Sequence, residues 1–146
     1  MNKKTHIQNL LNSFEKLTGK KIINRSNPEE DMKRVVQGLF VLVSHNGAQE
    51  PILNYGNPFA LNLWEMDWDS FTKTPSSKTA EPDLREQRKE MLDMVTKQGY
   101  FDDYGGVRIS ATGKRFLIKN AIIWNVHNEI GENIGQAAYF KKIVFF

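Results

Sequence analysis

The sequence of 146 residues contains no cysteine. This absence excludes disulfide bonds, thiolate metal sites, iron–sulfur clusters and cysteine nucleophiles, and it suits a reducing compartment. No stretch approaches the roughly 20 consecutive apolar residues that span a bilayer. The first residues, MNKKTHIQNLLNSFEKL, lack the continuous apolar run of a signal peptide. These absences predict a soluble, cytoplasmic protein without a membrane partner.

Clusters of basic residues are also missing. The formal charge is +3, and pairs of lysines are short and scattered, at residues 3–4, 20–21 and 141–142. Domains that bind nucleic acid gather lysine and arginine on one face. The sequence therefore predicts no nucleic-acid partner.

An amphipathic helix is predicted at the N-terminus, over residues 5–18, before the stop at Gly19. It divides the chain into an N-terminal helix and linker, 1–26, and one domain, 27–146. Two roles for its apolar stripe remain open: packing on its own domain, or contact with a second copy in a homodimer. The stripe consists of five residues: Ile7, Leu10, Leu11, Phe14 and Leu17.

Alternating helices and strands are predicted for the first half of the domain. Asn27 before Pro28, and Asn57 before Pro58, are typical helix caps. The turn at Asn46-Gly47 indicates a hairpin. The predicted elements are a helix from 28 to about 37, strands over 39–45 and 52–55, short helices over 58–64 and 67–71, and a longer helix over 83–98.

After residue 99, apolar and polar residues alternate with a period of two, and three strands are predicted in meander order. In the middle strand, Phe116, Ile118, Ile122, Trp124 and Val126 alternate with polar residues. This pattern predicts a sheet that is apolar on one face and wet on the other. The predicted fold is α+β: a five-stranded antiparallel sheet, with short helices and one longer helix covering one face, plus N-terminal helices.

This order of elements resembles the Per-ARNT-Sim (PAS) arrangement, and five motifs over about residues 35–140 resemble the MEKHLA domain, a PAS-related family. That family includes small free-standing bacterial proteins as well as the ends of plant class III homeodomain–leucine zipper proteins, whose other domains this chain lacks. The resemblance implies a PAS-like fold and a role in sensing or protein interaction, with no established catalytic activity. The motifs are ILNYGNPFALNLW, PSSKTAEP, REQRKEML, GYFDDYGGVRISATGKRF and IIWNVHNEIGENIGQAAYF.

By the same resemblance, a pocket is expected between the inner face of the sheet and the helices. Its candidate ligand-binding residues are polar: Asn54, Tyr55, Tyr104, Arg108, Trp124 and Gln136. The alternative is that these residues serve the core, the helix caps or the wet face of the sheet.

The residues do not favour the prosthetic groups of known PAS sensors. A flavin adduct or a thioester-linked chromophore needs a cysteine, and the haem-binding type presents a histidine on the long helix, where residues 83–98 contain none. His6, His45 and His127 are far apart without metal-ligand spacing, and we interpret them as surface residues. We expect no metal and no cofactor, but a noncovalently bound small molecule remains open.

Arg85 and Arg88 lie one turn apart on the predicted long helix, a spacing that suits a carboxylate or phosphate. The alternative is pairing with Glu81, Glu86 or Asp102.

Three functions follow as hypotheses: a PAS-like module that binds a small ligand or a signalling partner without catalysis, a small enzyme acting on a polar or anionic metabolite, and a ligand-free dimerisation scaffold.

Overall fold

The computed structural model describes residues 1–81 and 85–146. The elements in chain order are α1 (Lys3–Thr18), α2 (Pro28–Val36), β1 (Val41–His45), β2 (Leu53–Gly56), α3 (Pro58–Trp64), α4 (Trp68–Phe71), the 3-10 helix η1 (Ser76–Thr79), α5 (Arg85–Gln98), β3 (Tyr100–Ile109), β4 (Arg115–His127), β5 (Asn133–Phe140) and β6 (Lys142–Phe145).

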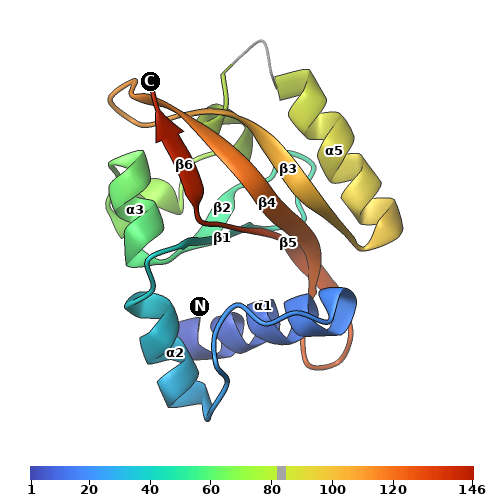
Figure 1. Cartoon of the computed structure of the whole chain (residues 1–146). Helices are drawn as coiled ribbons and strands as arrows, with labels where there is room; N and C mark the ends of the chain where they lie inside the picture. The colour runs from blue at the N-terminus through green and yellow to red at the C-terminus, as the bar shows by residue number, and fades with distance from the viewer. Residues whose placement is uncertain (82–84) are drawn as a thin grey trace.

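The strands form one antiparallel sheet in the order β2-β1-β5-β4-β3, with β6 also paired to β4 (Figure 1). β6 extends β5 along β4 without a change of register, since Ile122 lies opposite Tyr139 and Lys119 lies opposite Lys142. The predicted hairpin pairing, meander and α+β fold are confirmed. The sheet has six strands and not the predicted five, because the last predicted strand is interrupted at Lys141 into β5 and β6.

Short polar side chains begin the helices. In four of them the residue before the helix accepts a hydrogen bond from a backbone N–H three residues later, which satisfies a group that has no partner inside the helix. These caps are Asn2, Asn27, Asn57 and Asp67. Asn57 is fully buried, and its amide also donates to the carbonyls of Val35 and Phe40. The cap therefore fixes the corner between β2 and α3.

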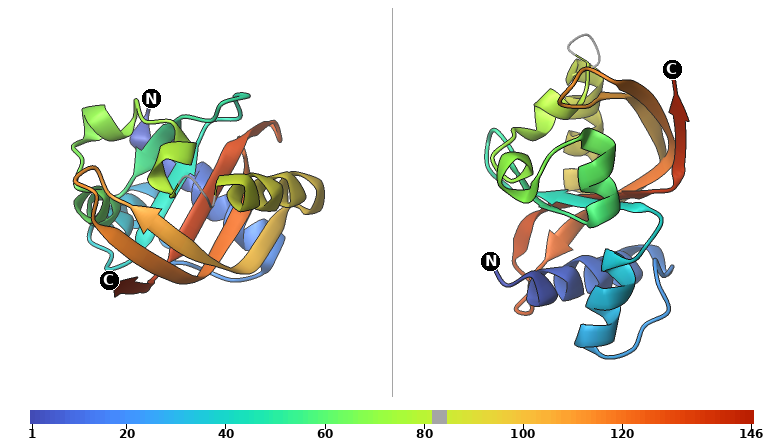
Figure 2. Two further views of the ribbon diagram at one scale, coloured as in Figure 1. Left: turned by 90° about the horizontal axis from the view of Figure 1, so that it is seen from above. Right: turned by 90° about the vertical axis from the view of Figure 1, so that its left-hand side faces the viewer.

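Helices cover both faces of the sheet (Figure 2). α1 and α2 lie on one side, and α3, α4 and α5 lie on the other. Each side buries its own hydrophobic cluster: the first contains Leu10, Phe14 and Trp124, and the second contains Trp64 and Phe116. The prediction that one face of the sheet stays wet is therefore wrong, because α1 covers that face.

A bulge in β4 explains part of this error. Asn120 adopts a φ of 53°, in the left-handed region, where the pairing of β3 with β4 is irregular. Phe116 and Ile118 belong to the cluster under α5, whereas Trp124 and Val126 belong to the cluster under α1. A strict period of two cannot predict this exchange of faces, since each residue inserted by a bulge reverses the alternation.

The stripe of α1 packs inside the chain. Ile7, Leu10, Leu11 and Phe14 are buried against the sheet, and Leu17 is half-buried beside them. Residues 1–26 and 27–146 thus share a hydrophobic cluster. A homodimer through the same side chains would require α1 to leave the sheet, and it remains a prediction.

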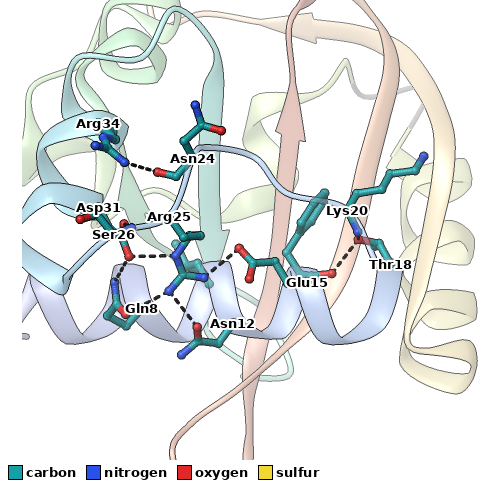
Figure 3. Close-up of polar contacts among 12 residues, drawn as sticks. Gln8, Asn12, Glu15, Thr18, Lys20, Asn24, Arg25, Ser26, Asp31 and Arg34 are labelled. Atoms are coloured by element: carbon teal, nitrogen blue, oxygen red, sulfur yellow. Dashed lines mark hydrogen bonds and ion pairs between the residues drawn. The ribbon is translucent and has the colours of Figure 1, made fainter.

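A polar clamp holds the linker after α1 in place (Figure 3). The guanidinium of Arg25 in the linker donates to Asp31 of α2 over 2.8 Å and to Glu15 of α1 over 2.8 Å. Asp31 is fully buried and also accepts from Gln8 of α1 over 3.0 Å. The linker is therefore bound to both helices.

The predicted long helix is confirmed as α5, and its predicted start and Leu84 lie outside the described residues. Val95 is buried, with Met91 and Leu92 half-buried beside it. Two side chains from the sheet hold this helix: Asn125 donates to the carbonyl of Val95 over 3.0 Å, and Gln136 donates to that of Leu92 over 3.1 Å.

Candidate functional site

A cavity of about 60 Å³ lies between the sheet and its cover of α5 and η1. Its walls are mostly aliphatic and aromatic. Half of its lining residues also carry a polar side-chain group, and the ones that bear on function are His45, Trp64, Ser76, Arg88, Tyr104 and Arg108.

Arg108 enters the cavity from β3 and is only 5% exposed. Its Nη2 donates to the hydroxyl of Tyr104 over 2.7 Å, and its Nη1 donates to its neighbour's carbonyl, that of Val107, over 3.0 Å. Gly106 makes room for the guanidinium: a Cβ there would lie 3.1 Å from Nη1, and its φ of 155° disfavours any side chain. The local sequence thus fixes Arg108 in the cavity.

Arg88 reaches the same cavity from α5, and its Nη2 donates to the hydroxyl of Ser76. Burial and, to a smaller extent, the nearby charge of Arg108 together lower the pKa of Arg88 to about 10. Arginine side chains stay cationic at neutral pH in proteins. Neither Arg88 nor Arg108 forms an ion pair with a carboxylate among residues 1–81 and 85–146.

A larger cleft of about 590 Å³ adjoins the cavity, between α5 and residues 46–51. His45, Arg88 and Gln136 line both spaces, so the cleft borders the cavity at these residues. The predicted pair of arginines separates here. Arg85 is exposed along the cleft, whereas Arg88 turns to Ser76.

The predicted ion-pair partner Glu81 binds elsewhere. Its carboxylate accepts from the guanidinium of Arg115 on β4. The arginines of α5 therefore do not share this carboxylate.

Three of the six predicted ligand-binding residues line the cavity: Tyr104, Arg108 and Gln136. The amide of Gln136 is already occupied, since its nitrogen donates to Thr96 over 3.0 Å as well as to the carbonyl of Leu92. These hydrogen bonds hold α5 on the sheet.

The other three predicted residues do not line the cavity. Trp124 lies on the opposite face of the sheet because of the bulge at Asn120. Tyr55 belongs to the same cluster as Trp124, and burial raises its pKa. Asn54 accepts a hydrogen bond from Ser44, whose hydroxyl also contacts His6 of α1.

Two histidines predicted on the surface are buried. His6 is 7% exposed on α1, and His45 is 7% exposed at the end of β1. Sequence reasoning also missed Trp64 and Ser76 as cavity residues. No local pattern marks them, since they reach the cavity from separate helices.

Two negative findings apply to the described part of the chain. It has no group of three or more histidine or acidic residues arranged to hold a metal ion. It also has no helix with the length and apolar character needed to cross a membrane.

Solved structures with the same fold are PAS and light-oxygen-voltage domains. The PAS domain of a protein from Colwellia psychrerythraea has a TM-score of 0.66 and 14% identity, over 76% of this chain and 92% of that one. An RNA-binding light-oxygen-voltage receptor has a TM-score of 0.62 and 11% identity, over 81% of this chain and 36% of that one. A light-oxygen-voltage domain studied with a flavin analogue has a TM-score of 0.62 and 10% identity, over 79% and 83%. These likenesses show a PAS-like fold.

A flavin does not fit this cavity. A cavity of about 150 Å³ holds one benzene molecule, and the tricyclic ring system of a flavin needs far more than the 60 Å³ present here. The chain also has no cysteine to form an adduct with the ring.

The family is shown by a direct match. No curated protein matches the chain. The model of the MEKHLA domain matches residues 4–145, which include nearly all of α1 and the whole sheet. This protein therefore belongs to the MEKHLA domain family.

Proposed function

We propose that this chain is a sensory or interaction module that binds a small organic anion noncovalently beneath α5 and relays its ligand state to a partner protein. We assign no catalytic step to it. One observation carries the proposal: the guanidinium groups of Arg88 and Arg108 meet at one cavity, and no described carboxylate neutralises them.

Two unpaired cations in a shared cavity are unfavourable. Each buried charge loses hydration at a cost on the order of several kcal/mol, and the two groups repel each other. The lowered pKa of Arg88 records both effects. A carboxylate between the two guanidinium groups compensates for the lost hydration and for the repulsion, because the guanidinium groups bind its two oxygens through charge-assisted hydrogen bonds.

The position of the two arginines suggests how a bound anion changes the surface. Arg88 belongs to α5 and Arg108 belongs to β3. An anion that bridges them adds a third connection between helix and sheet, next to those of Asn125 and Gln136. We expect the partner protein to read how firmly α5 is held.

Calorimetric titration with formate, acetate and glycolate, at constant ionic strength, tests the proposal. We expect at least one of these acids to bind the wild-type protein. Arg108→Gln is expected to weaken that binding tenfold or more, since a charged hydrogen bond contributes about 1.5–3 kcal/mol. Arg108→Gln removes the repulsion between two like charges, but it also removes the hydrogen bonds of Arg108 to Tyr104 and Val107.

Arg85→Gln is the matched control, because Arg85 lies one turn from Arg88 but is exposed outside the cavity. It should bind the acids as the wild type does. The proposal is wrong if none of the three acids binds, or if Arg85→Gln and Arg108→Gln weaken binding equally. NMR spectra of the titrated acids should remain unchanged over a day, and a new product would favour an enzyme instead.

A further inference from the structure

Two buried polar atoms in the described part of the chain have no hydrogen-bond partner: Nε2 of His45 and Nε1 of Trp64. Both residues line the cavity that contains Arg88 and Arg108. Buried polar groups are nearly always paired in folded proteins, and an unpaired one is costly. Their coincidence at one cavity indicates that a bound molecule completes them.

The tautomer of His45 follows from its neighbour. Its Nδ1 lies 2.8 Å from the backbone carbonyl of Asn46, which can only accept, so Nδ1 carries the hydrogen. Burial lowers the pKa of His45 to about 4, and the charge of Arg88 acts in the same direction. At neutral pH Nε2 is therefore a bare acceptor, and it needs a donor.

The indole of Trp64, in contrast to His45, lacks a hydrogen-bond acceptor. Its Nε1–H can only donate, so it needs an acceptor. A simple carboxylate has acceptors to offer the two arginines and Trp64, but it offers no hydrogen to His45. A hydroxyl group next to the carboxylate supplies the missing donor.

The size of the cavity limits the rest of the molecule. A volume of about 60 Å³ is well below the roughly 150 Å³ that holds the six carbons of benzene. Because His45 lines both the cavity and the cleft, a hydroxyl bound to its Nε2 lies near the border of the two spaces. The cavity is therefore large enough for the carboxylate of the ligand, and any further carbons of the ligand extend into the cleft.

We propose that the ligand is a small 2-hydroxycarboxylate, whose carboxylate lies between Arg88 and Arg108 and whose hydroxyl donates to Nε2 of His45. This inference rests on the proposed anion site and specifies its ligand. Glycolate is the smallest member of the class, and acetate is the same molecule without the hydroxyl.

The test compares glycolate with acetate by calorimetry at pH 7.5. We expect the wild-type protein to bind glycolate at least tenfold more tightly. His45→Phe keeps a planar ring but removes Nε2, so it should bind both acids with equal affinity. Equal affinities in the wild type, or an unchanged preference in His45→Phe, would overturn the inference while leaving the anion site intact. If neither acid binds, the inference falls together with the site.

A spectroscopic readout covers the case in which His45→Phe does not fold. In the ¹⁵N-labelled wild-type protein, glycolate should shift the Nε2 resonance of His45, and acetate should not. The indole N–H signal of Trp64 should move with both acids. That of Trp124 is the internal control, because it donates to Leu10 on the other face of the sheet. A His45 resonance unmoved by saturating glycolate would contradict the proposal.

Discussion

The indole nitrogen of Trp124 donates a hydrogen bond to the backbone carbonyl of Leu10 across 3.2 Å, which joins β4 to α1 over 114 positions of sequence. The ring of Phe14 meets the same indole edge-on, with 4.7 Å between the ring centroids. Trp124 itself is fully buried. α1 is therefore part of the core.

Deleting residues 1–26 should unfold the chain or leave it only partly ordered. Four fully covered side chains of α1 are lost, and burying each contributes about 1.5–3 kcal/mol, against a typical net stability of about 5–15 kcal/mol. Urea unfolding and the binding of a hydrophobic dye measure the effect. Lys21→Ala, at an exposed position of the linker, is the control.

A truncated chain with the unfolding midpoint of the full chain would contradict this prediction.

The homodimer is a separate question. Light scattering of the full chain at rising concentration tests it, and a dimer that forms without loss of the α1–sheet contacts would exclude the apolar stripe as its interface.

Asp31→Asn should lower the free energy of unfolding by about 1.5–3 kcal/mol, the usual contribution of a hydrogen bond to a charged group. The fully buried carboxylate accepts from Arg25, from Gln8 and from the backbone N–H of Ser26. Glu29→Gln is the matched control on the same helix, since Glu29 is exposed and meets Lys4 only at 3.8 Å. Equal losses in both variants would show that the clamp is not a stabilising contact.

The clamp also predicts acid sensitivity. Burial opposes the ionisation of Asp31, but hydrogen bonds from Gln8, Ser26 and Arg25 outweigh it and keep its pKa below the ordinary value. The unfolded carboxyl, with a pKa near ~3.9, therefore takes up its proton first as the pH falls. Below that pH the wild type should lose more stability per pH unit than Asp31→Asn, as urea titrations at pH 4 and pH 2.5 would measure.

The two buried histidines act at higher pH. Burial lowers the pKa of both His6 and His45 to about 4, whereas an unfolded histidine has a pKa of about 6.5. Between these two pH values the unfolded chain binds more protons than the folded chain, so the free energy of unfolding should fall as the pH drops from 6.5 to 4. The loss is up to roughly 1.4 kcal/mol per pH unit for each histidine.

The urea midpoint measured from pH 7.5 down to pH 4.5 checks this window. His6→Gln should reduce the slope, because only His45 then contributes. A midpoint that stays constant or rises on acidification would show that neither histidine is buried in its neutral form.

Asn120→Val should destabilise the protein by about 1–3 kcal/mol, since Asn120 has a φ of 53° that a β-branched residue avoids. Asn120→Gly adopts this φ without strain, although it loses the hydrogen bond to Asp103. Thermal unfolding of the two variants isolates the backbone effect. If both melt at the same temperature, the left-handed bulge does not carry strain.

Local chemistry predicted the elements well. The caps at Asn27 and Asn57 each act within a few residues, so they indicate helix starts directly. The predicted pairing of β1 with β2 is confirmed, but a loop of residues 46–52 connects them, and neither Asn46 nor Gly47 adopts the positive φ expected of a tight turn. The bulge at Asn120 has no such signal beyond an asparagine that tolerates positive φ. For that reason Trp124 was predicted on the wrong face of the sheet.

The site was predictable only in part. Arg108 and Tyr104 were predicted from the family resemblance, and they line the cavity. His45 and Trp64 were missed because burial and pairing depend on what surrounds a side chain, and those neighbours come from distant segments. The spacing of one helical turn between Arg85 and Arg88 suggested that these two arginines bind an anion together. Nothing in the sequence indicated that Arg88 would instead share a cavity with Arg108.

The sequence by itself determined the helices, the strands and their order, because capping, periodicity and turn formation depend on residues within about one helical turn of each other. The tertiary structure alone decided which face of β4 meets α1 and which two arginines share a cavity. A bulge reverses every later side chain of a strand, and the two guanidinium groups meet only after α5 folds onto β3.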